Sequence, residues 1–175
     1  IVIIAILFLI AAVGTKNFLT AYNLTNILKQ SSIIGIIAIA ETCIIITGGI
    51  DISCGAVVGM STLVVTMAQG RWGLSIPAAI CLALISGLLC GALNAVLVHE
   101  FNVTPFVATL GTQTIIRGLI KVYSNGGTVS GLKPEFSSFA SSSLGILPNL
   151  SIVWIAIAII MFLVLRYTVY GRNLF

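Results

Sequence analysis

Residues 46–55 read ITGGIDISCG and interrupt a chain that otherwise consists of long apolar runs. One such run, 31–47, ends in this stretch, and another, 54–69, begins in it. Paired glycines can end a helix in the left-handed conformation, and a carboxylate or hydroxyl can accept the free N–H groups that begin the next helix. The stretch therefore predicts a tight turn, in which Gly48-Gly49 ends one helix and Asp51 or Ser53 caps the other.

The same stretch also allows a functional interpretation. Interrupted helices hold substrate sites in many transporters, because irregular backbone is tolerated at membrane depth where it lines a water-filled path. Capped turns are common, so the residues themselves favour the turn. The two interpretations are compatible.

The composition is that of an integral membrane protein. The 175 residues are 59% hydrophobic and 7% charged, whereas soluble domains carry about 25% charged residues. The mean hydropathy is +1.21. Eight Lys and Arg residues face four Asp and Glu residues, but they are scattered at the edges of apolar runs, where they anchor helix ends at lipid headgroups. This distribution argues against nucleic-acid binding.

Six apolar runs approach the roughly 20 residues that a spanning helix needs. They are 1–13, 31–47, 54–69, 74–98, 105–121 and 150–167. No sustained period-two alternation indicates strands, so the predicted fold is all-α, a polytopic transmembrane helical bundle. Residues 1–175 are expected to form a single transmembrane domain. Its first run begins without a preceding segment and its last residues follow directly on a span, so we expect it to be truncated at both ends.

Two of the apolar runs carry small residues at regular spacing. Small residues four apart predict close helix packing; they are Ala83, Gly87, Gly91 and Ala95 in one run, and Gly55 and Gly59 in another.

The segment 122–149 has seven serines, four glycines and two prolines, which predicts an exposed loop that can hold a short helix. Such a loop is either a docking site for a soluble partner or a passive linker, and composition leaves both open.

Several polar residues lie within the apolar runs. Glu41 is near the middle of its run, where a charge costs about 3 kcal/mol on insertion scales, so it must be neutral, paired or beside a polar cavity. Thr109, Gln113, Arg117 and Lys121 form one stripe at four-residue spacing. Arg117 and Lys121 are expected to extend toward the headgroups. Asn94 favours a bond between helices over a ligand contact.

The chain shows no pattern typical of catalysis. Its four cysteines form no CxxC pair, and its single histidine, His99, stands alone at a helix end. No zinc-ligand spacing, nucleophile elbow or phosphate-binding loop occurs, so no enzyme activity, metal or cofactor is expected in this chain.

Three stretches in combination resemble a known family. They are TGGIDISCGAVVGM at 47–60, GALNAVLVHEFNVTPFVATLGTQTIIRGL at 91–119, and YGRN at 170–173. They are similar to the inner-membrane permease subunits of bacterial monosaccharide ABC importers, of the ribose, xylose and arabinose type. The resemblance covers roughly residues 25–175.

The resemblance implies a permease of about ten spanning helices, of which this chain is the N-terminal part. It implies two permease subunits, identical or different, a cytoplasmic ATPase that binds ATP, and a periplasmic or lipid-anchored sugar-binding protein. Gly171 and Arg172 would begin the loop that couples to the ATPase. The Glu41 position is usually apolar in this family, so the resemblance assigns Glu41 no role.

The resemblance also implies a cytoplasmic N-terminus. Six crossings would then leave Arg166 and Arg172 inside. Five basic residues would lie outside, against the positive-inside rule: Lys16, Lys29, Arg71, Lys121 and Lys133. Charge alone favours the opposite orientation.

The predicted function is a multi-pass permease subunit in the bacterial inner membrane that carries a monosaccharide such as ribose by alternating access. Sugar hydroxyls need hydrogen-bonding partners in the wall of the path. The candidates are Asp51, Ser53, Asn94, Thr109, Thr112 and Gln113. The alternative is an ion-coupled secondary transporter that uses Glu41 or Asp51.

Overall fold

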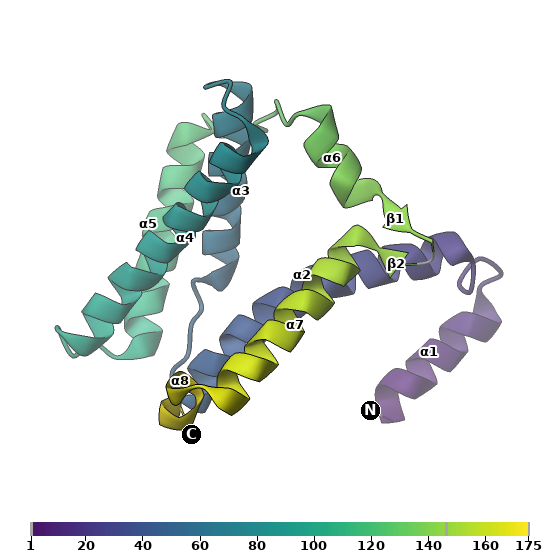
Figure 1. The fold of residues 1–175 in the computed structure, drawn as a ribbon, viewed down its shortest axis with the longest axis horizontal. Coiled ribbons are helices and arrows are strands. Elements are labelled where there is room, and N and C mark those ends of the chain that lie inside the picture. The colour runs from purple at the N-terminus through teal and green to yellow at the C-terminus, as the bar shows by residue number, and fades with distance from the viewer. Residues whose placement is uncertain (1, 146, 175) are drawn as a thin grey trace. The chain divides into compact units, whose positions relative to one another are not determined.

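The computed structural model describes residues 2–145 and 147–174, and most of these residues are in helices, which confirms the all-α class (Figure 1). The elements are α1 (Val2–Gly14), α2 (Ala21–Ile46), α3 (Cys54–Gly70), α4 (Ile76–His99), α5 (Pro105–Tyr123), α6 (Pro134–Ser141), β1 (Ser143–Leu144), β2 (Leu147–Pro148), α7 (Asn149–Tyr167) and α8 (Val169–Leu174). They belong to two compact units, one formed by Ile1–Ile39 and Phe139–Arg172, the other by Ala40–Ser138 and Asn173–Phe175.

The predicted helix bounds agree closely with the structure, except at the start of α2. This helix begins at Ala21 rather than at residue 31. The Thr20 hydroxyl accepts the Asn23 N–H across 3.4 Å, and the Asn23 side chain donates to the Phe18 carbonyl across 2.8 Å. These bonds satisfy polar groups at the helix start, so α2 extends through a polar stretch that the hydropathy pattern excluded.

Three of the described helices are long and apolar enough to cross a membrane, namely α2, α4 and α7. The helices α1 and α3 are apolar but shorter. α5 has 19 residues, and its polar stripe makes it less apolar than those three. All six predicted runs are helical, and a multi-pass arrangement in the membrane is confirmed.

The second unit is built around α3, α4 and α5, which pack against one another (Figure 1). Gly87 of α4 faces α3, because an added Cβ would be in ordinary van der Waals contact with the Ser61 hydroxyl oxygen at 3.6 Å and Val57 Cγ1 at 3.7 Å. Ser61 also donates to the Ala83 carbonyl across 3.3 Å. The predicted small-residue contact is therefore confirmed at Ala83 and Gly87.

The same prediction is wrong for two other glycines within the described residues. An added Cβ at Gly55 or Gly91 would meet no heavy atom within 4 Å. Gly59 instead approaches α5, with Ile120 Cδ1 at 3.1 Å from its added Cβ. Four-residue spacing places small residues along one helix face, but a single neighbouring helix covers only part of that face.

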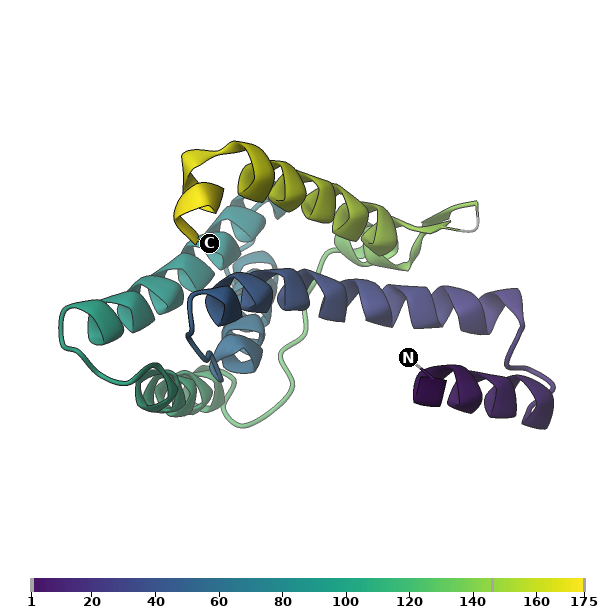
Figure 2. The ribbon, with the colours of Figure 1, turned by 90° about the horizontal axis from the view of Figure 1, so that it is seen from below.

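In the first unit, α2 and α7 lie side by side (Figure 2). The hydroxyls of Ser32 and Ser151 are both buried and lie 2.8 Å apart in a hydrogen bond between the helices. One turn further along, Gly35 faces the indole of Trp154 so closely that any Cβ at this position would clash with the ring. The hydrogen bond between the two serine hydroxyls and the missing side chain at Gly35 together allow α2 and α7 to approach closely.

The predicted loop 122–149 contains the expected short helix, α6, followed by the two-residue strands β1 and β2. The strands pair antiparallel, with Ser143 opposite Pro148 and Leu144 opposite Leu147. The Asn149 side chain donates to the Phe139 carbonyl across 3.1 Å, and Lys29 Nζ donates to the Ser141 carbonyl across 2.7 Å. These bonds tie the loop end to α2 and α7.

Candidate functional site

The stretch 46–55 begins with the predicted glycine cap. Gly48 has φ +78°, its N–H donates to the Ile45 carbonyl across 2.9 Å, and the Gly49 N–H donates to the Ile44 carbonyl across 3.0 Å. This is the Schellman arrangement that ends helices at a left-handed residue. The predicted end of α2 is confirmed, and it turns the chain toward α3.

Asp51 and Ser53 form the second half of this turn. One carboxylate oxygen, Asp51 Oδ1, accepts both the backbone N–H and the hydroxyl of Ser53, each across 2.6 Å. Ser53 is the N-cap residue of α3, but within the described residues its side chain makes no capping hydrogen bond. The prediction that Ser53 caps α3 with its side chain is therefore wrong, and its hydroxyl instead donates to Asp51 and accepts from the Asn94 amide.

Asn94 joins this turn from α4. Its side-chain Nδ2 donates to the Ser53 hydroxyl oxygen across 2.9 Å, and both residues are buried. The predicted bond between helices is thus present. The other amide atom, Oδ1, is buried and has no hydrogen-bond partner among the described residues. A buried acceptor of this kind is available to a ligand hydroxyl or to water.

Thr109 joins the turn from α5. Its hydroxyl oxygen accepts the Ile52 N–H across 3.3 Å, and its proton lies within reach of the Pro105 carbonyl at 2.9 Å and the Ile50 carbonyl at 3.4 Å. Four predicted residues from three segments therefore meet. We call Asp51, Ser53, Asn94 and Thr109 the helix-break cluster.

The remaining two pathway candidates continue along α5. Thr112 is 1% exposed, and its hydroxyl oxygen has no hydrogen-bond partner among the described residues. Gln113 is half-buried. Thr109 lies four residues after the start of α5, about 6 Å along the axis, so the helix-break cluster lies near one end of the α3–α5 bundle and Thr112 and Gln113 lie deeper.

Glu41 lies beside the cluster without belonging to it. It is half-buried and lies near the Cys54 thiol. Cys54 is the first residue of α3. The four cysteines are free.

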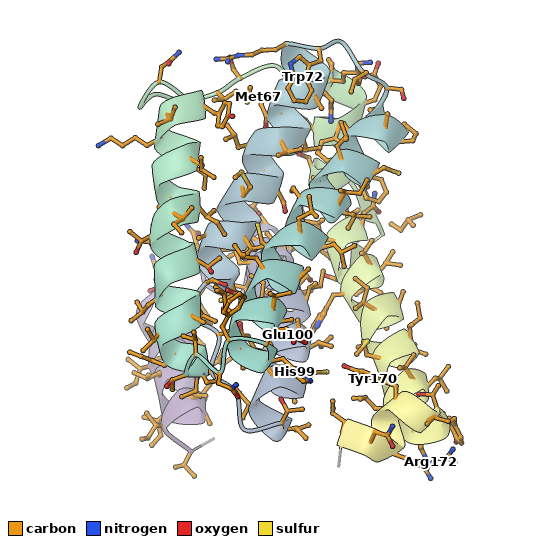
Figure 3. All side chains as sticks on the ribbon, turned by 90° about the vertical axis from the view of Figure 1, so that its left-hand side faces the viewer. Met67, Trp72, His99, Glu100, Tyr170 and Arg172 are labelled. Atoms are coloured by element: carbon orange, nitrogen blue, oxygen red, sulfur yellow. The ribbon has the colours of Figure 1, made fainter. Side chains whose placement is uncertain are left out.

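The predicted stripe on α5 becomes more exposed along the helix. Thr109 is buried, Gln113 is half-buried, and Arg117 and Lys121 are exposed. Trp72 lies at the end of the α3–α5 bundle where α5 finishes (Figure 3). His99 and Glu100 lie at the opposite end, which is also the end of the helix-break cluster. The His99 and Glu100 side chains are 3.8 Å apart and exposed, as expected for a histidine at a helix end.

The predicted start of the coupling loop lies in α8. Gly171 is buried directly against the Leu165 carbonyl, so this position excludes a side chain, and Arg172 is exposed. Figure 3 shows Tyr170 and Arg172 on this short helix. An exposed arginine at the end of a helix is available to a partner, and its role in coupling stays a prediction.

Sequence reasoning missed two polar contacts. Gln69 of α3 is 4% exposed, and its Oε1 accepts the Lys133 N–H across 2.9 Å. Its Nε2 is buried without a partner among the described residues. The second contact is the pair Ser32 and Ser151. A lone amide or hydroxyl within an apolar run is a usable signal for both, but its partner is separated by many residues and only the fold reveals it.

Several known proteins are similar to this chain. The ribose import permease RbsC of Bacillus subtilis is 35% identical over 171 residues, which is 96% of this chain and 52% of that protein. The autoinducer 2 permease LsrD of Klebsiella pneumoniae is 37% identical over 149 residues, 81% of this chain and 44% of that protein. The autoinducer 2 permease LsrC of Escherichia coli is 29% identical over 174 residues, 98% of this chain and 50% of that protein.

The chain spans about half the length of these curated relatives. No solved structure matches it significantly. The family described as the branched-chain amino acid transport system permease component matches residues 23–175, and the resemblance to sugar-importer permeases is confirmed by the relatives. The match covers most of the chain, which therefore belongs to this permease family.

Proposed function

We propose that this chain is part of the membrane-spanning permease subunit of an ATP-binding-cassette importer that carries a monosaccharide such as ribose across the bacterial inner membrane. The observation that carries the proposal is the 35% identity to a ribose import permease over 96% of the chain. The multi-pass helical fold supports it, because polar side chains gather there between membrane helices.

The helix-break cluster contributes a rigid part of the translocation path. Most of its hydrogen-bonding capacity is used internally, which fixes the start of α3 against α4 and α5. Among the residues that the structure describes, two oxygens on these helices have no hydrogen-bond partner and can accept from a passing hydroxyl or from water, namely Asn94 Oδ1 and Thr112 Oγ1. The path therefore offers few polar contacts, which suits a route that releases its solute readily.

The energy comes from partners. A cytoplasmic ATPase binds and hydrolyses ATP and shifts the permease between two arrangements, and a sugar-binding protein delivers the solute. A second permease subunit completes the path. In this chain α8, with the exposed Arg172, begins the surface that meets the ATPase. The N-terminus lies in the cytoplasm in this proposal.

The test is uptake by the complete system. The full permease, the ATPase and the binding protein encoded beside it are reconstituted in proteoliposomes, and entry of radiolabelled D-ribose is followed with and without ATP. We expect uptake that needs ATP and disappears with an ATPase whose catalytic carboxylate is replaced. Uptake driven by a proton gradient, with the inactive ATPase, would overturn the proposal in favour of a secondary transporter.

A further inference from the structure

A second polar region lies at the other end of α3 from the helix-break cluster. A groove of about 190 Å³ opens between the C-terminal halves of α3 and α5, beside the loop that follows α5. The part of its lining that decides the chemistry is Thr62, Leu63, Thr66, Ile120, Ser124 and Gly127. Drug-sized pockets measure roughly 300–1,000 Å³, so this groove suits only a small molecule.

The free hydrogen-bonding capacity of the groove consists mainly of acceptors. The Thr62 and Thr66 hydroxyls donate their protons to the Val58 and Thr62 carbonyls, each across 2.8 Å, and the Ser124 hydroxyl donates to the Lys121 carbonyl across 3.4 Å. A hydroxyl that donates in this way keeps lone pairs with which to accept. The groove therefore favours a ligand that donates O–H groups, rather than a carboxylate or phosphate that only accepts.

A buried side-chain amide, that of Gln69, lies close to the groove along α3 but does not line it. Gln69 is three residues after Thr66, and therefore on the same face of α3. It is 4% exposed, and its Nε2 has no partner among the described residues. A buried amide of this kind can be satisfied by a bound water. The hydroxyl acceptors of the groove and the apolar side chains of Leu63 and Ile120 together match a polyol with hydroxyl groups and a C–H face.

The loop beside the groove is fixed to α3. Lys133 N–H donates to Gln69 Oε1 across 2.9 Å. Gly131 has φ +123°, and a Cβ there would lie 2.7 Å from Gly70 Cα, so only glycine allows this approach of two backbones. These contacts fix the loop against α3 close to Val129, which lines the groove, so this side of the groove is preformed rather than assembled by the ligand.

We propose that this groove is a binding site for a neutral monosaccharide or a polyol of similar size, separate from the helix-break cluster. The choice of ligand rests on the proposed function, whereas the site rests on the hydroxyls that line the groove and on the apolar side chains beside them. A solute that occupies it lies beside Thr62 and Thr66, about 14–20 Å along α3 from Ser53 of the helix-break cluster at 1.5 Å per residue. The path thus has a site at each end.

The experiment measures protection of a cysteine in the groove. The complete importer is prepared in nanodiscs with Cys43, Cys54, Cys81 and Cys90 replaced by alanine, and with Ser124→Cys as the only cysteine of this chain. Thr128→Cys, exposed in the same loop, is the matched control. We expect D-ribose to slow maleimide labelling of Ser124→Cys at least fivefold, D-ribonate to have little effect, and neither to protect Thr128→Cys.

A second variant distinguishes direct contact of the ligand with the groove from a conformational change caused by binding elsewhere in the importer. Thr66→Val, introduced beside Ser124→Cys, removes one acceptor, and we expect the D-ribose concentration for half-protection to rise about two- to tenfold. Thr114→Val is the control, since this exposed threonine of α5 bonds only to Leu110 in the described structure. Protection by D-ribonate equal to that by D-ribose, or no response to Thr66→Val, would overturn the proposal.

The two proposals fail separately. If D-ribose uptake depends on ATP but D-ribose does not protect Ser124→Cys, only the proposal of a binding site in the groove is overturned. If D-ribose protects Ser124→Cys and Thr66→Val weakens this protection, but uptake does not depend on ATP, the binding site in the groove is supported and the importer proposal is overturned.

Discussion

The side-chain amide of Asn94 donates to the hydroxyl of Ser53 across 2.9 Å, which joins α4 to the residue that begins α3. Ser53 is fully buried and passes its own proton to Asp51 across 2.6 Å. The amide, hydroxyl and carboxylate thus form one chain of donors and acceptors. Any rearrangement that separates α4 from the start of α3 must break it.

The first prediction concerns this bond. In a double-mutant cycle on the complete permease, Asn94→Leu and Ser53→Ala should each lower the free energy of unfolding, and the pair should be coupled by about 0.6 kcal/mol, the average for hydrogen bonds between membrane helices. Unfolding in SDS, followed by circular dichroism, measures all four corners of the cycle. Strictly additive losses would mean that the bond contributes nothing to stability.

The second prediction separates the geometry of Asp51 from its charge. Asp51→Asn keeps an oxygen that can accept from Ser53, whereas Asp51→Ala removes both hydrogen bonds. We expect Asp51→Ala to lower the free energy of unfolding by about 1–2 kcal/mol, with Asp51→Asn close to wild type in stability and in D-ribose uptake. A folded Asp51→Asn protein without uptake would show that the charge itself is required.

The third prediction concerns the contact between α2 and α7. Gly35→Ala should weaken this pair, because the added methyl group overlaps the Trp154 indole. Overpacking of this kind costs about 1–3 kcal/mol, measured as loss of unfolding free energy in SDS.

Gly91→Ala of α4 is the matched control, since an added Cβ there meets nothing within 4 Å in the described chain. Replacing a glycine inside a helix should then stabilise by about 0.5–1 kcal/mol. Equal losses in both variants would contradict the structural distinction. They would also show that the open face of α4 packs against another part of the complete permease.

The sequence predicted the helices well because each apolar run is bounded by strong local signals. Gly48 and Pro105 are examples: one ends a helix in the left-handed conformation and the other occupies the first turn of α5. The start of α2 was missed, because Thr20 and Asn23 cap a turn that hydropathy does not mark. Local capping chemistry, not the apolar pattern, decides such a boundary.

The candidate site could be predicted only in part. Asp51 and Ser53 are neighbours in sequence, so their bond was within reach of local reasoning. Asn94 and Thr109 were chosen for polarity, but their meeting with residues 50–53 depends on how α3, α4 and α5 pack. Gln69 was missed for the same reason, since its partner Lys133 is 64 residues away. The periodicity of a helix shows which face of that helix a residue occupies, but it does not show which residue of another segment lies opposite.

The last prediction settles the orientation on which sequence and resemblance disagree. The turn after α3 holds Trp72, and the end of α4 holds Glu100, at opposite ends of α4 (Figure 3). In the cysteine-free permease, a membrane-impermeant maleimide added to intact spheroplasts should label Trp72→Cys and Thr128→Cys but not Glu100→Cys, as a cytoplasmic N-terminus requires. Opening the membrane should make all three reactive, which controls for accessibility. Labelling of Glu100→Cys alone in intact spheroplasts would reverse the orientation, and Arg71, Lys121 and Lys133 would then obey the positive-inside rule.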